Sequence, residues 1–221
     1  MTPVQITVRG SHTTTLPPEQ ATVHVNLAAE GPDPQPVFDA VATALADVTR
    51  SLASRHHGED GPVTKYVVDQ VRRGSHRPVN RDGEQLPLVH TAAVAMTATF
   101  TDFDDLAAWV GWSAAVPGLG ISYIDWALTD TRRRRVERKT RQKAVRDARR
   151  RAQDYSDALG LGSVTARTVT DPGMGGQIQP KAMLARAMSA PADRSPQVSL
   201  RPDEVQIEAQ VEATFTVPGS K

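Results

Sequence analysis

The sequence of 221 residues contains no cysteine, few aromatic residues and no long apolar run. The lack of cysteine excludes disulfides, thiolate catalysis, iron–sulfur clusters and zinc sites built on sulfur. Residues 1–6 lead directly into a strand-like segment, without the basic and apolar regions of a signal peptide. No stretch approaches the roughly 20 apolar residues of a membrane-spanning helix. We therefore expect a cytoplasmic protein without a membrane span.

A long alternating strand is the clearest pattern in the chain. Apolar residues occupy every second position of residues 205–217, and Glu, Gln and Thr lie between them. Successive side chains of a strand face opposite sides of a sheet, so this strand has one dry face and one wet or partner-facing face. Residues 4–9 and 21–29 are strand-like too, and they are expected to form a first hairpin.

Three helices are predicted from apolar spacing and end signals. The first begins at Pro36 and extends to residue 52, and the second follows Asp102, a plausible N-cap, as far as residue 114. The third covers residues 131–159 and is stopped by Gly160. Its expected inward stripe consists mostly of small residues, which let a helix lie close to a sheet: Val136, Thr140, Ala144, Ala148, Ala152, Tyr155 and Leu159.

Strands complete the pattern between these helices. They are predicted at residues 65–71, 89–101, 121–128 and 164–169, with a mobile hairpin excursion at 73–87 that is rich in Gly, Pro and Asn. Strands that follow one another without a helix between them indicate antiparallel pairing. The order predicts an α+β fold with antiparallel sheets and helices packed on one face.

The connection at 171–202 is long for a compact domain and is rich in Pro, Gly, Met and Ala. Met side chains adapt to irregular apolar surfaces. We expect Met183, Leu184 and Met188 to occupy an apolar groove, on another subunit. Trp112 is a further candidate for a subunit interface, because it is offset from the apolar stripe of its helix and Trp is enriched at interface hot spots.

Charge is distributed unevenly along the chain. The formal net charge is only +1, but residues 132–151 contain ten Arg and two Lys against two acidic residues. Such asymmetry indicates an anionic partner or a neighbouring subunit of opposite charge. The candidate contact residues are Arg132, Arg133, Arg134, Arg135, Arg138 and Arg141.

Three roles are open for these arginines. They form a solvated face, they pair with the acidic strand face of a neighbour at Glu204, Glu208 and Glu212, or they bind phosphates bidentately. Nucleic-acid modules usually add stacking aromatics, and this helix has only Tyr155.

No motif in the chain indicates catalysis. His56 and His57, with acidic neighbours at 59 and 60, are interpreted as an exposed turn, because a dedicated metal site needs three or four supported ligands. The tetrapeptide Arg-Gly-Ser-His occurs at 9–12 and again at 73–76, which we interpret as coincidence. No glycine pattern completes a phosphate loop, and no serine lies in a nucleophile elbow. We therefore predict no catalytic residue, no cofactor and no metal.

Several stretches resemble the SIMPL-domain family, a domain of unknown function. They are Ile6-Thr7-Val8-Arg9-Gly10, then Leu16-Pro17-Pro18-Glu19-Gln20-Ala21-Thr22-Val23, residues 144–152 before the Leu-Gly-Leu-Gly at 159–162, residues 183–188, and the closing strand at 202–217. The resemblance implies one SIMPL-like domain over 1–221. Relatives include bacterial periplasmic immunogenic and oxidative-stress defence proteins. Members look like oligomers and lack an agreed enzymatic activity.

The resemblance and the residues together lead to a prediction with two alternatives. We expect a non-enzymatic homo-oligomer with an assembly or interaction role. The first alternative is an anion- or nucleic-acid-binding protein that uses the Arg-rich helix 131–159. The second is an enzyme or small-molecule binder whose site forms between subunits.

Overall fold

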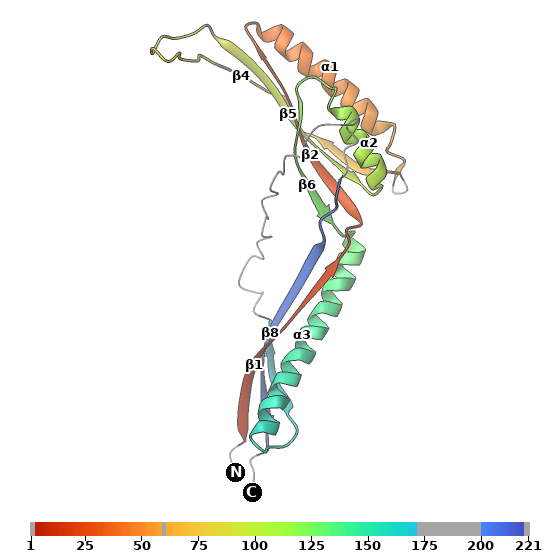
Figure 1. The fold of residues 1–221 in the computed structure, drawn as a ribbon, viewed down its shortest axis with the longest axis vertical. Coiled ribbons are helices and arrows are strands. Elements are labelled where there is room, and N and C mark those ends of the chain that lie inside the picture. Colours follow the sequence, from red (N-terminus) through yellow and green to blue (C-terminus); the bar gives the residue numbers. More distant parts are fainter. Residues whose placement is uncertain (1–2, 59–60, 172–199, 219–221) are drawn as a thin grey trace, which may run out of the picture. The chain divides into compact units, whose positions relative to one another are not determined.

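The computed structural model describes residues 3–58, 61–171 and 200–218. These residues divide into two compact units. Unit 1 contains the described residues 3–16, 129–171 and 204–218, and unit 2 contains 17–58, 61–128 and 200–203. Both combine antiparallel sheet with helix (Figure 1), so the predicted α+β class is confirmed.

Unit 1 has a three-stranded antiparallel sheet in the order β1-β8-β7. Its strands are β1 (Val4–Leu16), β8 (Val205–Val217) and β7 (Thr165–Thr170). The central strand, β8, pairs with β1 along its whole length, from Val4 opposite Val217 to Leu16 opposite Val205. The predicted alternation holds in β8, because most of its apolar side chains are buried and Gln206, Glu208, Gln210 and Glu212 are exposed.

The long helix α3 (Asp130–Ala158) packs on β1 and β8 of the same unit. Its buried residues recur every four positions: Val136, Thr140, Ala144, Ala148, Ala152 and Ser156. The prediction that Tyr155 and Leu159 continue this stripe is wrong, since their relative exposures are 60% and 65%. Ser156 takes the inward position, and its hydroxyl group bonds the carbonyl oxygen of Gly162 at 2.6 Å, which satisfies it in the core.

Close approach between α3 and β1 depends on Gly10. A Cβ atom at this position would lie 2.5 Å from the backbone nitrogen and 2.7 Å from the Cβ atom of Ala148, and it would also collide with the carbonyl oxygen of Ala144. The small buried residues of α3 and the lack of a side chain at Gly10 of β1 therefore allow the two backbones to lie close together.

Unit 2 has a five-stranded antiparallel sheet. Its main path runs β3 (Val63–Val68), β5 (Val89–Phe100), β2 (Gln20–Gly31) and β6 (Leu119–Ala127), and β4 (Arg72–His76) also pairs with β5. The expected hairpin of the first two strands is wrong, because β1 and β2 belong to different sheets. Pro17 and Pro18 lie between them, and proline fixes the backbone and lacks the N–H group that strand pairing needs.

Two helices cover one face of the unit 2 sheet. They are α1 (Pro34–Ala53) and α2 (Phe103–Ser113), close to their predicted positions. Asp102 caps α2 as predicted, with its side chain accepting hydrogen bonds from the N–H groups of Asp104 and Asp105. Trp109 and Phe100 are fully buried in the core, with ring centroids 5.7 Å apart.

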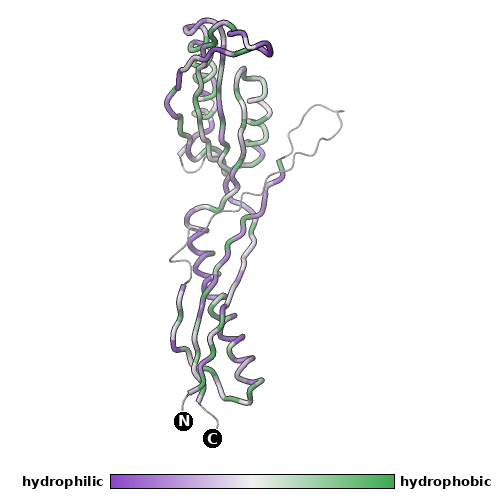
Figure 2. Tube along the Cα trace, turned by 90° about the vertical axis from the view of Figure 1, so that its left-hand side faces the viewer, coloured by the Kyte–Doolittle hydropathy of each residue, from purple (hydrophilic) through white to green (hydrophobic). Residues whose placement is uncertain are grey.

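Hydropathy differs between the helices. Figure 2 shows green, hydrophobic stretches along the helices of unit 2, whereas the amino-terminal part of α3 is largely hydrophilic. Among the residues that the structure describes, no helix has both the length and the apolar character that crossing a bilayer requires.

Candidate interaction surfaces

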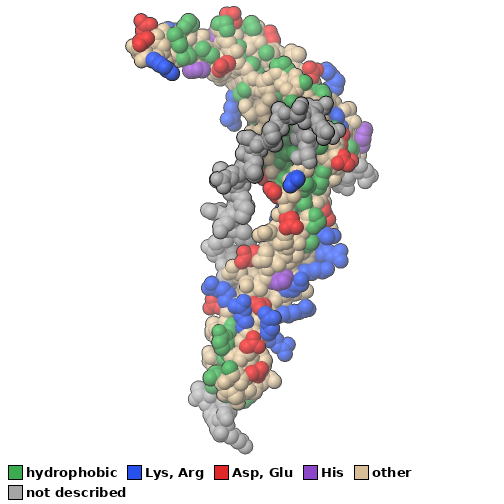
Figure 3. Space-filling view, viewed as in Figure 1, with side chains coloured by type: hydrophobic (Ala, Val, Ile, Leu, Met, Phe, Trp, Pro, Cys, Tyr) green, Lys and Arg blue, Asp and Glu red, His purple; other side chains and the backbone are tan. Residues whose placement is uncertain are grey.

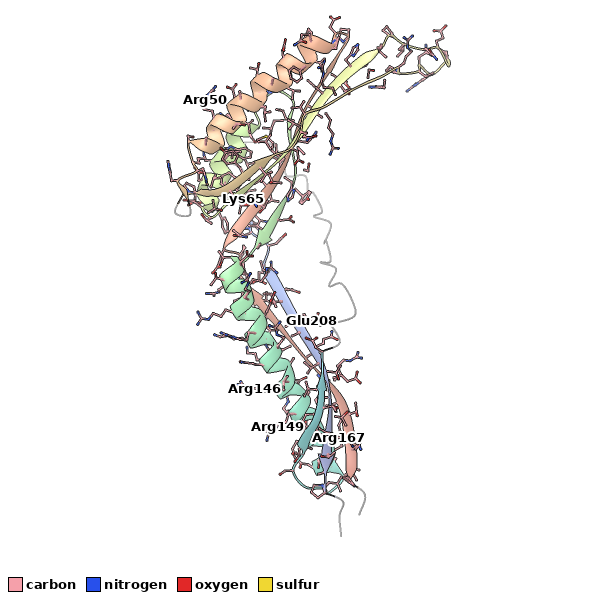
Figure 4. All side chains as sticks on the ribbon, turned by 180° about the vertical axis from the view of Figure 1, so that it is seen from behind. Arg50, Lys65, Arg146, Arg149, Arg167 and Glu208 are labelled. Carbon is pink, nitrogen blue, oxygen red and sulfur yellow. The ribbon has the colours of Figure 1, made fainter. Side chains whose placement is uncertain are left out.

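The outer side of α3 is a continuous basic surface. We call its exposed cations the basic face; they are Arg132, Arg134, Arg135, Arg138, Lys139, Arg141, Lys143, Arg146, Arg149, Arg150 and Arg151. Of the six predicted contact arginines, only Arg133 is half-buried. Figure 3 shows Lys and Arg side chains gathered along this helix, and Arg146 and Arg149 project from it in Figure 4.

Few cations of the basic face have an ion partner in the described part of the chain. Arg150 and Arg151 pair with Asp147 at 2.8 and 2.9 Å. Arg138 and Arg146, by contrast, form no ion pair with any residue that the structure describes. A surface with this many unpaired like charges repels itself unless an anionic partner covers it.

Asp147 has a structural role at this helix. Its Oδ2 atom accepts a hydrogen bond of 3.1 Å from the backbone N–H of Ser11, which ties α3 to β1. This bond, with support from Arg151 and Arg150, lowers the pKa of the Asp147 carboxyl group. The two arginines beside it therefore neutralise a carboxylate of their own helix.

The strand face of unit 1 offers little charge to balance the basic face. Glu212 already pairs with Arg9 of its own chain at 3.9 Å. Glu204 and Glu208 are exposed and without an ion partner in the described residues. The charges of these two glutamates cannot neutralise a helix segment that carries ten arginines.

The balancing charge lies in unit 2. Residues 17–128 contain 14 acidic and 7 basic residues, a formal net charge of −7. The sequence of unit 1, residues 1–16, 129–192 and 204–221, contains 9 acidic and 17 basic residues, a formal net charge of +8. Each unit thus has the charge sign that attracts the other unit of a second copy.

A groove of unit 2 runs along α1 and is bounded by the end of α2 and the residues after it. Its volume is about 1070 Å³, and small side chains of α1 line it together with Trp112, Val116 and Pro117. Its charged lining residues, all from α1 and the turn after it, are of both signs: Asp39, Asp47, Arg50 and Arg55. Trp112 is 38% exposed, so the structure places this predicted interface residue at an accessible apolar wall. The contribution of α1 was missed in the sequence, because its exposed side carries no unusual motif.

One protein-family model matches most of the chain. The model of the family described as SIMPL, a protein of unknown function (DUF541), matches residues 6–215. The chain belongs to the SIMPL family. The match begins in β1 and ends in β8, so it includes both units of this SIMPL protein. No curated protein matches the chain significantly.

A histidine–aspartate pair lies on the open face of the unit 2 sheet in this SIMPL protein. His24 Nε2 is 3.0 Å from Asp125 Oδ2, and the His24 ring stacks on Tyr123 at a centroid distance of 4.0 Å. A hollow of about 360 Å³ beside them is lined by polar groups that include Asn26 and Asp69. The pair is exposed and has no nucleophile bonded to it among the described residues, so it lacks the arrangement of an activated nucleophile.

The remaining candidates give no site. His56 Nδ1 bonds the carbonyl oxygen of Val63 at 2.8 Å, which anchors the turn after α1. The described residues contain no cluster of three or more His, Cys, Asp or Glu side chains that could hold a metal ion. Met183, Leu184 and Met188 lie outside the described residues, so their expected contact stays a prediction.

Proposed function

We propose that this SIMPL protein is a non-catalytic assembly protein, whose copies associate through unit 1 of one copy and unit 2 of the next. The observation that carries the proposal is the opposite formal charge of the two units, +8 and −7. The basic face of α3 supplies most of the positive charge. Contact between two different surfaces is heterologous, and it produces a closed ring or an open filament.

The strength of such a contact follows from general magnitudes. An exposed ion pair contributes about 0.2–1 kcal/mol, and even millimolar binding needs about 4 kcal/mol. Several ion pairs alone therefore give weak association. Salt weakens it further, because the Debye length is only about 8 Å at physiological ionic strength. A stable assembly requires an apolar contact as well.

Removing charge from the basic face tests the proposal. The test variant replaces four exposed cations of α3 by glutamine: Arg138, Arg141, Arg146 and Arg149. The matched control removes the same number of positive charges from exposed positions of unit 2: Lys65, Arg72, Arg77 and Arg81. Sedimentation velocity at low salt should show a smaller species for the test variant. The control should show a species at least as large as the wild type, because it makes unit 2 more negative. Equal behaviour of both variants would contradict the role of α3.

A second candidate function is binding of nucleic acid by the same helix. It is favoured by the density of exposed cations on α3. Arg and Lys bind phosphates, and the salt dependence of the affinity becomes steeper with each phosphate that is contacted. Tyr155, with 60% exposure, is the one aromatic residue of α3 available for stacking. The test is whether protein purified at low salt carries ultraviolet absorbance of nucleic acid and shifts labelled DNA or RNA. A clean absorbance ratio and no shift would exclude this function.

A further inference from the structure

We infer that a small hollow beside strand β4 of unit 2 binds a phosphate group. The hollow has a volume of about 240 Å³ and lies within unit 2, so it needs no second copy of the chain. Its lining in the described residues contains a cation and several polar groups but no carboxylate: Pro34, Arg73, Gly74, Ser75, His90 and Thr91.

The pairing of β4 with β5 brings three polar side chains of this hollow together. Ser75 lies opposite His90, and Arg73 lies opposite Ala92. Ala92 is buried in the cluster that α1 covers, so Arg73 and Ser75, two residues apart, share the helix-covered face of β4. Opposite residues have Cβ atoms about 4.5–5.5 Å apart, and diagonal ones about 7–8 Å. A ligand of a few ångströms can therefore contact all three side chains.

Arg73 is held in place without losing its hydrogen-bond donors. Its guanidinium carbon lies 5.1 Å from the ring centroid of Phe38 in α1. Stacking occupies a face of the planar guanidinium group, whereas its N–H groups point outward in the plane. No carboxylate in the described part of the chain pairs with Arg73. By contrast, Arg9 in the first Arg-Gly-Ser-His tetrapeptide pairs with Glu212.

The other two side chains are available to the same ligand. Neither the Ser75 hydroxyl group nor the His90 ring has a side-chain hydrogen bond to any residue that the structure describes. A serine hydroxyl donates one hydrogen bond, and a histidine ring donates one when neutral and two when protonated. The hollow thus joins a fixed cation to two donors that lack an acceptor.

This set of donors favours a phosphate group. The guanidinium fork binds two oxygen atoms at once, and both oxygens of a carboxylate would be taken by it. A phosphate group has further oxygen atoms for Ser75 and His90. The hollow has about eight times the volume of roughly 30 Å³ that a water molecule occupies in the liquid, so it holds one such group, and the rest of a phosphate ester would extend into solvent.

The surrounding charge also attracts an anion to this place. Residues 17–128 contain seven basic residues, and four of them lie within residues 72–81. Of the 14 acidic residues in the same range, only Asp82 and Glu84 belong to the segment between β4 and β5. An anion that approaches the otherwise acidic unit 2 is therefore drawn toward β4 and the residues after it.

Isothermal titration calorimetry with inorganic phosphate at physiological ionic strength tests the site. The test variant is Arg73→Gln with Ser75→Ala. The matched control is Arg72→Gln, which removes the same charge from the opposite face of β4, since Arg72 is exposed and lies opposite Ala93. The basic face of α3 is identical in all three proteins, so any difference in affinity belongs to β4.

The wild type should bind phosphate saturably, and the test variant should bind it at least about tenfold more weakly, because charge-assisted hydrogen bonds are lost. The control should change the affinity by less than about twofold. No binding to the wild type would overturn the inference, and so would equal losses in the test variant and the control. A monomeric wild type that binds phosphate would support the site and contradict the proposed assembly.

Two further ligands define what the site recognises. Acetate at the same concentration should bind much more weakly than phosphate, and equal affinity would overturn the role of the additional oxygen atoms. Glycerol 3-phosphate presents the same group as an ester. Tighter binding of the ester would support a site for phosphate esters, and tighter binding of inorganic phosphate would support a site for the free ion.

Arg73→Lys gives an independent readout. It keeps the positive charge but replaces the planar fork by a single ammonium group. Arg73 is exposed, so the variant should fold, which circular dichroism can verify. We expect at least about fivefold weaker binding of phosphate. Wild-type affinity in the folded lysine variant would show that the fork is not used, and it would overturn the proposed geometry.

Discussion

Replacing Gly10 by alanine tests how closely α3 and β1 must approach. Elsewhere in a strand, alanine is favoured over glycine by about 0.5–1 kcal/mol, because glycine loses more backbone entropy on folding. At Gly10 the added Cβ atom would lie 2.5 Å from the backbone nitrogen of Ala148, so the whole helix has to move. Overpacking of this kind costs about 1–3 kcal/mol, and a clash with backbone belongs at the upper end. We expect a net loss of about 2 kcal/mol.

The chain contains its own control for this substitution. Gly74 occupies the same position in the second Arg-Gly-Ser-His tetrapeptide, in β4. A Cβ atom there would lie 3.2 Å from the Thr91 hydroxyl oxygen, which belongs to a side chain that can rotate away. Gly74→Ala should therefore change stability by less than about 1 kcal/mol in either direction.

Circular dichroism at 222 nm during thermal unfolding measures the difference, because α3, with 29 residues, is the longest helix described. For a unit of this size, each kcal/mol shifts the melting temperature by about 4–8 °C. The three tryptophans lie in unit 2, so their fluorescence reports that unit. Equal melting temperatures for Gly10→Ala and Gly74→Ala would refute the close packing of α3 on β1.

Three further substitutions test individual contacts. Asp147→Asn should cost about 1 kcal/mol of unfolding free energy at neutral pH, because the hydrogen bond from Ser11 favours the carboxylate. The pKa of Asp147 is lowered in the folded protein, so this cost should shrink below the unfolded pKa of about 3.9 and disappear once the pH is below the folded pKa. Urea unfolding at neutral and at acidic pH can show the difference. Thr140→Val removes the 2.9 Å hydroxyl contact with Thr14 and should cost about 1 kcal/mol, with the Thr14→Val, Thr140→Val double variant losing less than the sum of the single losses in urea unfolding. Trp109→Ala should lower the free energy of unfolding by about 3–5 kcal/mol. Trp109→Phe should lower it much less, because the buried indole Nε1 atom has no hydrogen-bond partner to lose in the described structure. Equal losses of unfolding free energy for the two variants in chemical denaturation would contradict this.

The regular elements were largely predictable from local patterns. The alternation at 205–217 identified β8 and its dry face, and apolar spacing located α1 and α3 within a few residues. These signals are local, because each depends on the period of a single strand or helix. Strand partners depend on distant segments, which is why the first hairpin was wrong: β1 pairs with β8, at the other end of the chain.

The candidate surfaces were predictable only in part. The arginines of α3 stand out in the sequence, and the helical period places most of them outside. The groove depends on how α1 and α2 lie beside each other, which no local pattern specifies. The sequence predicted Tyr155 rather than Ser156 at the end of the inward stripe of α3, because Tyr has the larger apolar side chain. The hydroxyl group of Ser156 is satisfied in the core by the carbonyl oxygen of Gly162, a contact that only the folded chain shows.

The molar mass of the wild-type protein in solution, measured by multi-angle light scattering across a range of salt concentrations, tests the central claim most directly. The account predicts a mass well above 23.9 kDa at micromolar concentration and low salt, and a decrease toward that value as salt screens the contact between the basic face and unit 2. A constant mass of 23.9 kDa at every salt concentration would contradict it.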